Sequence, residues 1–237
     1  MSFYKNFADG KHIQEKGIKK EEVLAVQNEF EKCRNRLVLS FVPKGDTRLL
    51  EIGSGKGSFA EECLKQGDIK YFGIEPEETL ASQLISKGYN IEQVFVPPIP
   101  FENNSFDVIT HSHVIEHLDN AHHAYKFMTE SKRVLKNNGL LIFRCPNALT
   151  WGMGFWDVDY THSFVTTPTR IKQLLYDCDF KIVYFEELSF FKPRHFGKFK
   201  YIVPRNIKFL NKLYPKISKF LGKFIKKDTE LIFVCKK

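Results

Sequence analysis

Residues 49–59 read Leu-Leu-Glu-Ile-Gly-Ser-Gly-Lys-Gly-Ser-Phe, an apolar run that ends in a carboxylate and breaks into alternating glycines. A helical pattern follows at once, because Phe59, Ala60, Cys63 and Leu64 recur on one helical face. Glycine lets the backbone turn sharply and approach a ligand without interference from a Cβ atom. The first turn of a helix also offers unpaired N–H groups. The stretch therefore predicts a strand, a ligand-binding turn and a helix.

A second apolar run, residues 71–74, ends in Glu75 at the distance expected for the next strand of a βαβ unit. An acid at that strand tip accepts hydrogen bonds from ribose hydroxyls. The first run reads E-x-G-x-G-x-G, which differs from the G-x-G-x-x-G of dinucleotide-binding folds. The competing interpretation is an α/β turn that binds no nucleotide, followed by a surface glutamate.

These residues resemble the class I S-adenosylmethionine-dependent methyltransferases, over roughly residues 45–187 and the last strand. The resemblance implies an α/β fold with a doubly wound, mostly parallel, seven-stranded Rossmann-like sheet whose final strand is antiparallel. It also implies S-adenosyl-L-methionine as cofactor. Many members carry an acid after strand 3 that binds the adenine amino group, whereas this chain has Val96 and a proline there. The cofactor-binding residues that the resemblance implies are Glu51, Gly53, Ser54, Gly55, Gly57, Glu75, Pro76, Val96 and His111.

Length and composition favour one α/β domain with an added segment, since the chain has 237 residues. The expected division is an N-terminal helical segment (1–45), a cofactor-binding core (46–187), a helical insertion (188–228) and the last strand (229–237). Five dispersed cysteines favour reduced thiols, and we expect a cytoplasmic protein because residues 1–20 lack the apolar stretch of a signal peptide.

The net charge of +8 is concentrated in one late segment. Residues 192–227 hold 12 Lys or Arg and no Asp or Glu, which leaves 24 basic and 28 acidic residues, a net charge of −4, elsewhere. Apolar residues in 205–227 recur at spacings of three and four, which predicts basic amphipathic helices. Three interpretations stay open: packing on the enzyme as a lid or dimer surface, peripheral contact with an anionic membrane at the inner face of the cell, or attraction to RNA.

A histidine-rich stretch follows the predicted fourth strand, where residues 111–117 read His-Ser-His-Val-Ile-Glu-His. A helix that began near His113 would place Glu116 and His117 on its face. His162 lies in the loop after the predicted fifth strand, which opens toward the same edge. Imidazole and carboxylate together suit Zn²⁺, Mn²⁺ or Fe²⁺. The candidate metal ligands are thus His113, Glu116, His117 and His162.

The relatives that this stretch resembles differ in whether they bind a metal ion. Most class I relatives use V-I-E-H-L without a metal, whereas ubiquinone O-methyltransferases and small-RNA 3′-end 2′-O-methyltransferases show E-x-x-E-H with a divalent ion. This chain has His113 in place of the first Glu of that pattern. Without a metal, a neutral histidine near pH 7 is a suitable general base for an alcohol acceptor. The catalytic candidates are His162, His117 and His113.

Several acceptors fit this pattern. The main hypothesis is O-methylation of a small-molecule or lipid-linked glycan precursor of a bacterial surface polysaccharide, since residues after 159 resemble methyltransferases of that kind. An aromatic loop of Trp151, Phe155, Trp156 and Tyr160 would form a wall for a sugar ring, or would simply pack as core and lid. The alternatives are metal-assisted 2′-O-methylation of RNA ends, a nitrogen or phosphoramidate acceptor, and a non-catalytic scaffold that keeps the cofactor pocket.

Overall fold

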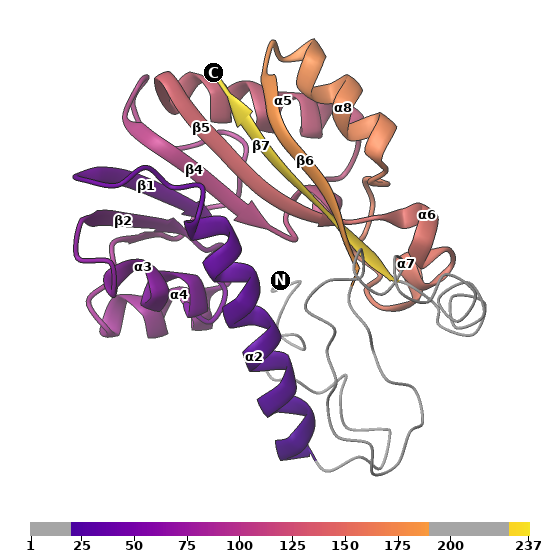
Figure 1. Cartoon of the computed structure of the whole chain (residues 1–237), viewed down its shortest axis with the longest axis horizontal. Coiled ribbons are helices and arrows are strands. Elements are labelled where there is room, and N and C mark those ends of the chain that lie inside the picture. Colours follow the sequence, from indigo (N-terminus) through magenta and orange to yellow (C-terminus); the bar gives the residue numbers. More distant parts are fainter. Residues whose placement is uncertain (1–19, 190–227) are drawn as a thin grey trace, which may run out of the picture.

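The body of the molecule is one seven-stranded sheet with helices on both faces (Figure 1). The computed structural model describes residues 20–189 and 228–237. The strands are β1 (Thr47–Ile52), β2 (Ile69–Ile74), β3 (Ile91–Glu92), β4 (Phe106–Ser112), β5 (Leu135–Pro146), β6 (Lys181–Ser189) and β7 (Thr229–Lys236). Their order is β3-β2-β1-β4-β5-β7-β6, with β7 antiparallel to both of its neighbours. This topology confirms the predicted fold class.

The helices begin where the sequence supplies caps. They are α2 (Lys20–Leu39), α3 (Ser58–Leu64), α4 (Glu78–Ser86), α5 (Ala121–Val134), α6 (Ala148–Trp151), α7 (Gly154–Asp157) and α8 (Pro168–Asp177), with a 3₁₀ turn, η2, over Ile115–His117. Asn120 and Thr167 cap α5 and α8, because each side chain accepts a hydrogen bond from a first-turn N–H group. Pro168 occupies the first turn of α8, where its missing N–H costs nothing.

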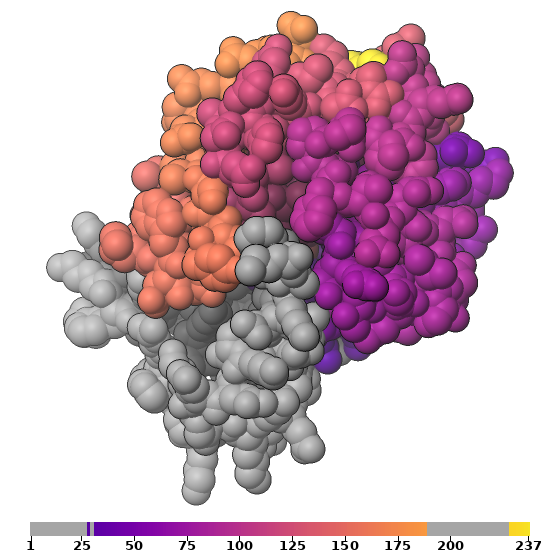
Figure 2. Space-filling model, turned by 180° about the vertical axis from the view of Figure 1, so that it is seen from behind, coloured from indigo at the N-terminus to yellow at the C-terminus, as the bar shows by residue number. Residues whose placement is uncertain are grey.

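Two apolar cores lie on opposite faces of the sheet, and β1 contributes to both because its side chains alternate. Leu50 and Ile52 belong to the core that α5 and α8 cover. Leu49 belongs to the core that α2 and α3 cover. Helices α5 and α8 contact each other on their face of the sheet. In the view from behind, the orange surface near α8 accordingly adjoins the pink surface that includes α5 (Figure 2). Glu51 stands between Leu50 and Ile52 in β1, so the same alternation places it on the face of Leu49.

The structure corrects three boundaries. The predicted third strand, expected over residues 91–96, is reduced to Ile91–Glu92, because the chain turns after it and the Val94 N–H donates to the Glu92 carbonyl. The helix considered near His113 is replaced by η2, since His113 adopts φ +56° and its N–H donates to the Arg144 carbonyl. The tryptophan- and glycine-rich loop after β5 contains α6 and α7, which the sequence pattern did not indicate.

Parts of the predicted division lie outside the described residues. These are residues 1–19 of the N-terminal segment and residues 190–227 of the basic insertion, so the amphipathic helices expected over 205–227 stay a prediction. Within residues 20–189 and 228–237, no helix combines the length and the apolar character needed to cross a membrane. The candidate site lies where β1, β4 and β5 end and β7 begins, and α2 passes this edge of the sheet (Figure 1).

Candidate functional site

The glycine turn after β1 has two kinds of glycine. Gly53, Gly55 and Gly57 all adopt positive φ, at +78°, +54° and +82°, which side chains rarely tolerate. A Cβ atom on Gly53 or Gly57 would lie 2.7 Å from Val114 Cγ2 or 2.5 Å from Leu84 Cδ2, so these two glycines permit packing under the turn. A Cβ atom on Gly55 would meet no atom of the described residues within 4 Å. The turn is therefore open to a ligand at Gly55.

Glu75, at the tip of β2, is joined to this turn. Its Oε2 accepts a hydrogen bond from the Gly55 N–H at 2.7 Å, and its Oε1 accepts one from the Glu77 N–H at 3.0 Å. Burial raises the pKa of the Glu75 carboxyl, while the two backbone N–H groups lower it. Each oxygen of the carboxylate has a further lone pair. The group therefore fits the two hydroxyls of a ribose that lies against Gly55 and the half-buried Pro76.

Glu51 and Ser54 support the turn from below. The Tyr71 hydroxyl lies 2.5 Å from Glu51 Oε2 and 2.9 Å from Ser54 Oγ, and all three side chains are buried. Burial raises the pKa of Glu51 to about 8, so this carboxyl is protonated at neutral pH. Glu51 and Ser54 were both predicted to bind the cofactor, and that role stays a prediction beside their hydrogen bonds with Tyr71.

The side chain of His111 lies in the core, and the predicted contact of this residue with the cofactor stays a prediction. Its ring is fully buried in the core, stacked on Phe143 with centroids 4.7 Å apart and edge-on to Phe127 at 5.1 Å. Burial lowers the pKa of His111 to about 3, so the ring is neutral. Val96 is half-buried and packs against the same core. Its predicted contact with adenine stays a prediction.

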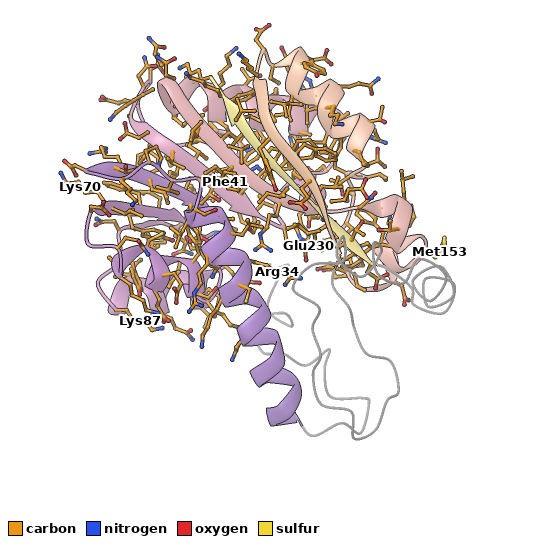
Figure 3. The ribbon with its side chains drawn as sticks, in the orientation of Figure 1. Arg34, Phe41, Lys70, Lys87, Met153 and Glu230 are labelled. Carbon is orange, nitrogen blue, oxygen red and sulfur yellow. The ribbon has the colours of Figure 1, made fainter. Side chains whose placement is uncertain are left out.

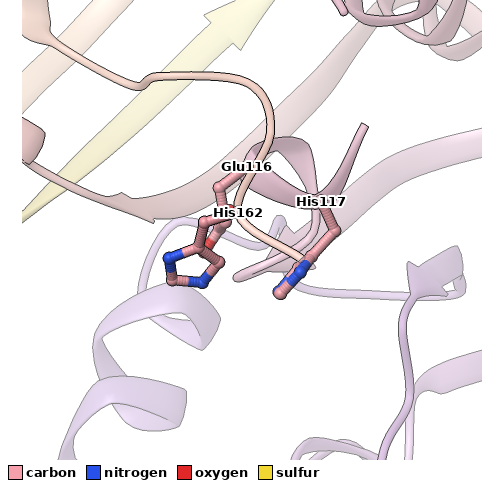
Figure 4. A group of neighbouring side chains, drawn as sticks. All are labelled: Glu116, His117 and His162. Carbon is pink, nitrogen blue, oxygen red and sulfur yellow. The ribbon is translucent and has the colours of Figure 1, made fainter. Parts of the chain in front are cut away.

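Three of the predicted polar residues do converge. Glu116 and His117 come from η2, and His162 comes from the loop between α7 and α8. One ligand atom of each lies within 4.8 Å of those of the other two (Figure 4). The backbone joins the two segments, because the N–H groups of Ser163 and Phe164 donate to the Glu116 carbonyl at 2.9 and 3.0 Å.

Hydrogen bonds assign the tautomers of the two imidazoles. His162 Nδ1 lies 2.5 Å from the Phe155 carbonyl oxygen, which only accepts, so this nitrogen carries the proton. The Thr161 hydroxyl donates to Asp159 Oδ1 at 2.7 Å and therefore accepts from His117 Nδ1, also at 2.7 Å. Burial lowers the pKa of His117, which keeps the ring neutral. In both rings Nε2 is thus the nitrogen with the lone pair.

His113 does not belong to this group. Its Nδ1 lies 3.1 Å from Glu116 Oε1, and its Nε2 lies 3.4 Å from Glu230 Oε1. Burial opposes a charge on this ring, but the carboxylates of Glu230 and Glu116 raise the pKa of His113 to about 9. A protonated imidazole has no lone pair for a proton or a metal. This pairing separates His113 from the group of Glu116, His117 and His162, and its predicted roles as a base and as a metal ligand stay predictions.

A buried network of charges surrounds His113, and the sequence analysis missed it. Glu230 accepts a hydrogen bond from Arg34 at 2.6 Å (Figure 3). It also accepts one from the fully buried Arg144 at 3.1 Å. Arg144 also lies 3.2 Å from Glu31 of α2. The available signal was a charged residue inside each of two apolar strands, β5 and β7. Such a residue is seldom buried unless it is paired.

The aromatic loop divides into buried and exposed members. Phe155 is fully buried, with its ring centroid 4.8 Å from that of His162, and Trp151 donates to the Thr229 carbonyl at 2.9 Å. Trp156 and Tyr160 are exposed, at 45% and 79%. The core interpretation holds for Phe155, and an acceptor-binding wall stays a prediction for Trp156 and Tyr160.

Comparisons with known proteins agree with this geometry. Residues 25–184 match a family profile described as "Methyltransferase domain". A probable S-adenosylmethionine-dependent methyltransferase of Mycobacterium tuberculosis is 29% identical over 138 residues, which are 56% of this chain and 48% of the relative. A tRNA (guanine-N(7)-)-methyltransferase of Mycoplasmoides gallisepticum is 28% identical over 147 residues, 55% of this chain and 65% of the relative. The chain thus spans about half the length of its mycobacterial relative.

Solved structures show the same fold. A SAM-dependent methyltransferase of Archaeoglobus fulgidus superposes with a TM-score of 0.66 at 19% identity, over 89% of this chain and 94% of that one. A possible histamine N-methyltransferase of Thermotoga maritima superposes with a TM-score of 0.63 at 21% identity, over 92% and 94%. At these identities the likeness concerns the fold alone.

Proposed function

The chain belongs to the class I S-adenosylmethionine-dependent methyltransferases, and we propose that it transfers a methyl group from this cofactor to a hydroxyl oxygen. The family match covers residues 25–184, which include the glycine turn, Glu75 and the histidine pair. When bound, S-adenosyl-L-methionine supplies an electrophilic methyl carbon on its sulfonium. Gly55 leaves room for the cofactor, and Glu75 accepts hydrogen bonds from its ribose.

The observation that supports a hydroxyl acceptor is the pair of imidazoles, His117 and His162, that lie together beyond the ends of β4 and β5. His162 and His117 each donate through Nδ1, which leaves Nε2 able to take a proton. We assign His162 as the base and His117 as its neighbour, since their ring centroids lie 4.8 Å apart. His162 would take the hydroxyl proton as the acceptor oxygen bonds to the methyl carbon, and the bound cofactor would supply that carbon by loss of its carbon–sulfur bond, which gives S-adenosylhomocysteine.

For the acceptor we favour a sugar or lipid-linked glycan precursor of a bacterial surface polysaccharide. The exposed rings of Trp156 and Tyr160 stand on the loop that supplies His162, where they suit the apolar face of a sugar. The 12 basic residues of 192–227 would bring a cytoplasmic enzyme to the inner face of an anionic membrane, where a lipid-linked acceptor is found.

A second candidate is methyl transfer to RNA, to a 2′-hydroxyl or to a base nitrogen. The similarity to a tRNA (guanine-N(7)-)-methyltransferase and the basic segment support it. The remainder of the chain, with a net charge of −4, opposes it, because phosphate contacts dominate binding to RNA.

Calorimetry tests the cofactor assignment without an acceptor. Glu75→Ala should weaken S-adenosyl-L-methionine binding by about 1–3 kcal/mol, since the ribose hydroxyls lose their acceptors. Gly55→Val should abolish binding, because its side chain would occupy the open side of the turn. Glu78→Ala, at an exposed position, is the matched control. Wild-type affinity in both Glu75→Ala and Gly55→Val would contradict the assignment.

A mass-spectrometric screen of nucleotide sugars, lipid-linked glycans and short RNAs then tests the acceptor. The wild-type chain with S-adenosyl-L-methionine should methylate a glycan hydroxyl, and His162→Ala should lose turnover while it still binds the cofactor. Methylation of RNA alone would favour the second candidate. Full turnover by His162→Ala would remove this residue as the base.

A further inference from the structure

We propose that an exposed apolar surface formed by α6, α7 and their flanking residues inserts into the surface of an anionic lipid bilayer. This surface, the apolar tip, consists of Leu149, Met153 and Val158, whose side chains are 73%, 79% and 56% exposed. Together with Trp156 and Tyr160, five exposed large hydrophobic side chains lie within residues 149–160, and no other stretch of that length in the described chain holds more than two. Such a cluster marks a surface that contacts a partner.

The fold holds the apolar tip outward. Trp151 Nε1 donates to the Thr229 carbonyl at 2.9 Å, which fixes α6 to the start of β7. Phe155 of α7 is fully buried, and its carbonyl oxygen lies 2.5 Å from His162 Nδ1. Met153, by contrast, lies at the margin of the molecule in the view of Figure 3. The apolar tip is therefore a preformed surface, and it adjoins the residue that the proposed function assigns as the base.

The charge near the apolar tip has two sources. Asp157 and Asp159 belong to the same stretch, and their carboxylates oppose contact with anionic lipids. The 12 Lys or Arg of residues 192–227 outweigh them, and that segment contains no Asp or Glu. The basic segment follows β6 and precedes β7, where Ser189 pairs with Thr229 and Thr229 is bonded to α6. The chain therefore attaches its excess of positive charge, at both ends, beside the apolar tip.

Three features favour a bilayer over other partners of this surface. The aliphatic side chains of the apolar tip suit burial between acyl chains, but they do not stack on bases as aromatic rings do in RNA binding. Trp and Tyr, here Trp156 and Tyr160, are typical of the boundary between membrane and water. A second copy of this chain would bring two basic segments together, which repulsion between like charges opposes. An anionic bilayer satisfies the apolar, aromatic and basic features together.

This inference rests on the proposed function and identifies the carrier of its acceptor. With the apolar tip among the acyl chains, Trp156 and Tyr160 would lie at the level of the headgroups, where the sugar of a lipid-linked acceptor is exposed. His162 follows on the same loop, between α7 and α8. The lipid would thus stay in the bilayer while its sugar reaches the base. The apolar tip therefore favours membrane-anchored acceptors over free nucleotide sugars.

Co-sedimentation with vesicles measures this contact without any acceptor. The full chain is mixed at low salt with vesicles of phosphatidylglycerol and phosphatidylcholine, or of phosphatidylcholine alone, and we expect stronger binding to the anionic vesicles. The tip variant, Leu149→Ser, Met153→Ser and Val158→Ser combined, should bind them at least roughly tenfold more weakly. Full burial of one such side chain is already worth about that factor.

The matched control combines Ile85→Ser, Tyr176→Ser and Val183→Ser, which remove exposed side chains of α4, α8 and β6. This control should bind the anionic vesicles as the wild-type chain does. Calorimetry with S-adenosyl-L-methionine and thermal unfolding check that each variant is folded. Met153→Ser alone, at the most exposed position of the apolar tip, decides if the triple variant unfolds.

The outcomes separate this inference from the proposed function. An absence of wild-type binding to anionic vesicles, or equal binding by the wild-type chain and the tip variant, would overturn the inference. Loss of vesicle binding in excess short RNA would overturn it in favour of RNA, and a change from dimer to monomer in the tip variant would do so in favour of a second copy. Cofactor binding without vesicle binding leaves the proposed methyl transfer intact, whereas vesicle binding without cofactor binding contradicts that function alone.

Discussion

The glycine turn and the histidine cluster lie at the same edge of the sheet but are built differently. The turn follows β1 and contacts the tip of β2. These two strands pair in parallel from Thr47 and Ile69 onward. The structure of the turn depends mainly on backbone N–H groups and on the positions of its glycines. The histidine cluster joins η2 to a loop about 45 residues later, through side chains and two backbone N–H groups. Local backbone conformation therefore determines the glycine turn, whereas packing between distant segments determines the histidine cluster.

The pKa values of the buried carboxyls also differ between the glycine turn and the histidine cluster. Around the turn, the carboxyls of Glu51 and Glu75 have a raised pKa because burial dominates. Beside the cluster, Glu230 is buried too, but His113, Arg34 and Arg144 lower its pKa to about 2. Close cations therefore lower the pKa of a buried carboxyl at Glu230, whereas burial raises it at Glu51 and Glu75, where hydrogen bonds only partly oppose the effect.

The largest expected effect comes from breaking the charged network. Arg144→Met should lower the free energy of unfolding by about 3–5 kcal/mol, since it leaves buried Glu230 with one cation fewer. Arg36→Met, at an exposed position, is the control and should change it little. Thermal and urea unfolding measure the difference. Equal stability of the two variants would mean that the cluster does not depend on this network.

A matched pair of glycines tests the turn. Gly57→Ala should cost about 2–4 kcal/mol of unfolding free energy, because a strained positive φ is combined with overpacking against Leu84. Gly55→Ala should cost only the strain, about 1–2 kcal/mol, since its Cβ meets open space. Urea unfolding compares the two. A larger loss for Gly55→Ala would contradict the assignment of its open side to a ligand.

The raised pKa of Glu51 predicts a pH dependence of stability. Between its ordinary value of 4.5 and about 8, folded Glu51 holds a proton that the unfolded chain lacks. Stability therefore falls as pH rises through this window, by at most about 1.4 kcal/mol per pH unit from this group. Glu51→Gln should flatten the decline in unfolding experiments from pH 5 to 8. Parallel curves for the two proteins would show that Glu51 is ionised in the folded chain.

The smallest effect concerns the link between Asp159 and His117. Thr161→Val should cost about 0.5–1.5 kcal/mol of unfolding free energy, because the hydroxyl between the two groups is lost. Thr161→Ser keeps the hydroxyl and should restore most of it. Nitrogen-15 NMR of the His117 ring should also show the Nδ1–H tautomer in the wild type and in Thr161→Ser. An Nε2–H tautomer there would contradict the assigned hydrogen bonds.

The sequence predicted what periodicity and glycine position control. The strand, glycine turn and helix expected from residue 49 onward are β1, the turn and α3, and Glu75 follows the end of β2 as expected. The convergence of Glu116, His117 and His162 was also foreseen, because the carboxyl ends of β4 and β5 meet at one edge.

The features that sequence analysis missed depend on partners far along the chain. The residues next to His113 in the sequence do not indicate that Glu230 lies 3.4 Å from its ring, so this ion pair was not predicted. The burial of His111 was missed for the same reason, because its ring stacks on Phe143 only once the sheet is formed. The turns α6 and α7 are four residues each, too short to give a helical period.

The position of β7 has a consequence for the order in which the molecule can be completed. This strand is the last in the chain, yet it lies between β5 and β6 and supplies buried Leu231, Ile232 and Phe233 to both cores. Among the described strands, β6 has no other sheet partner. A ribosome that has released only residues up to 228 therefore presents β6 and one edge of β5 without their neighbour. The sheet closes only after β7 emerges, so this edge is exposed to other chains throughout synthesis.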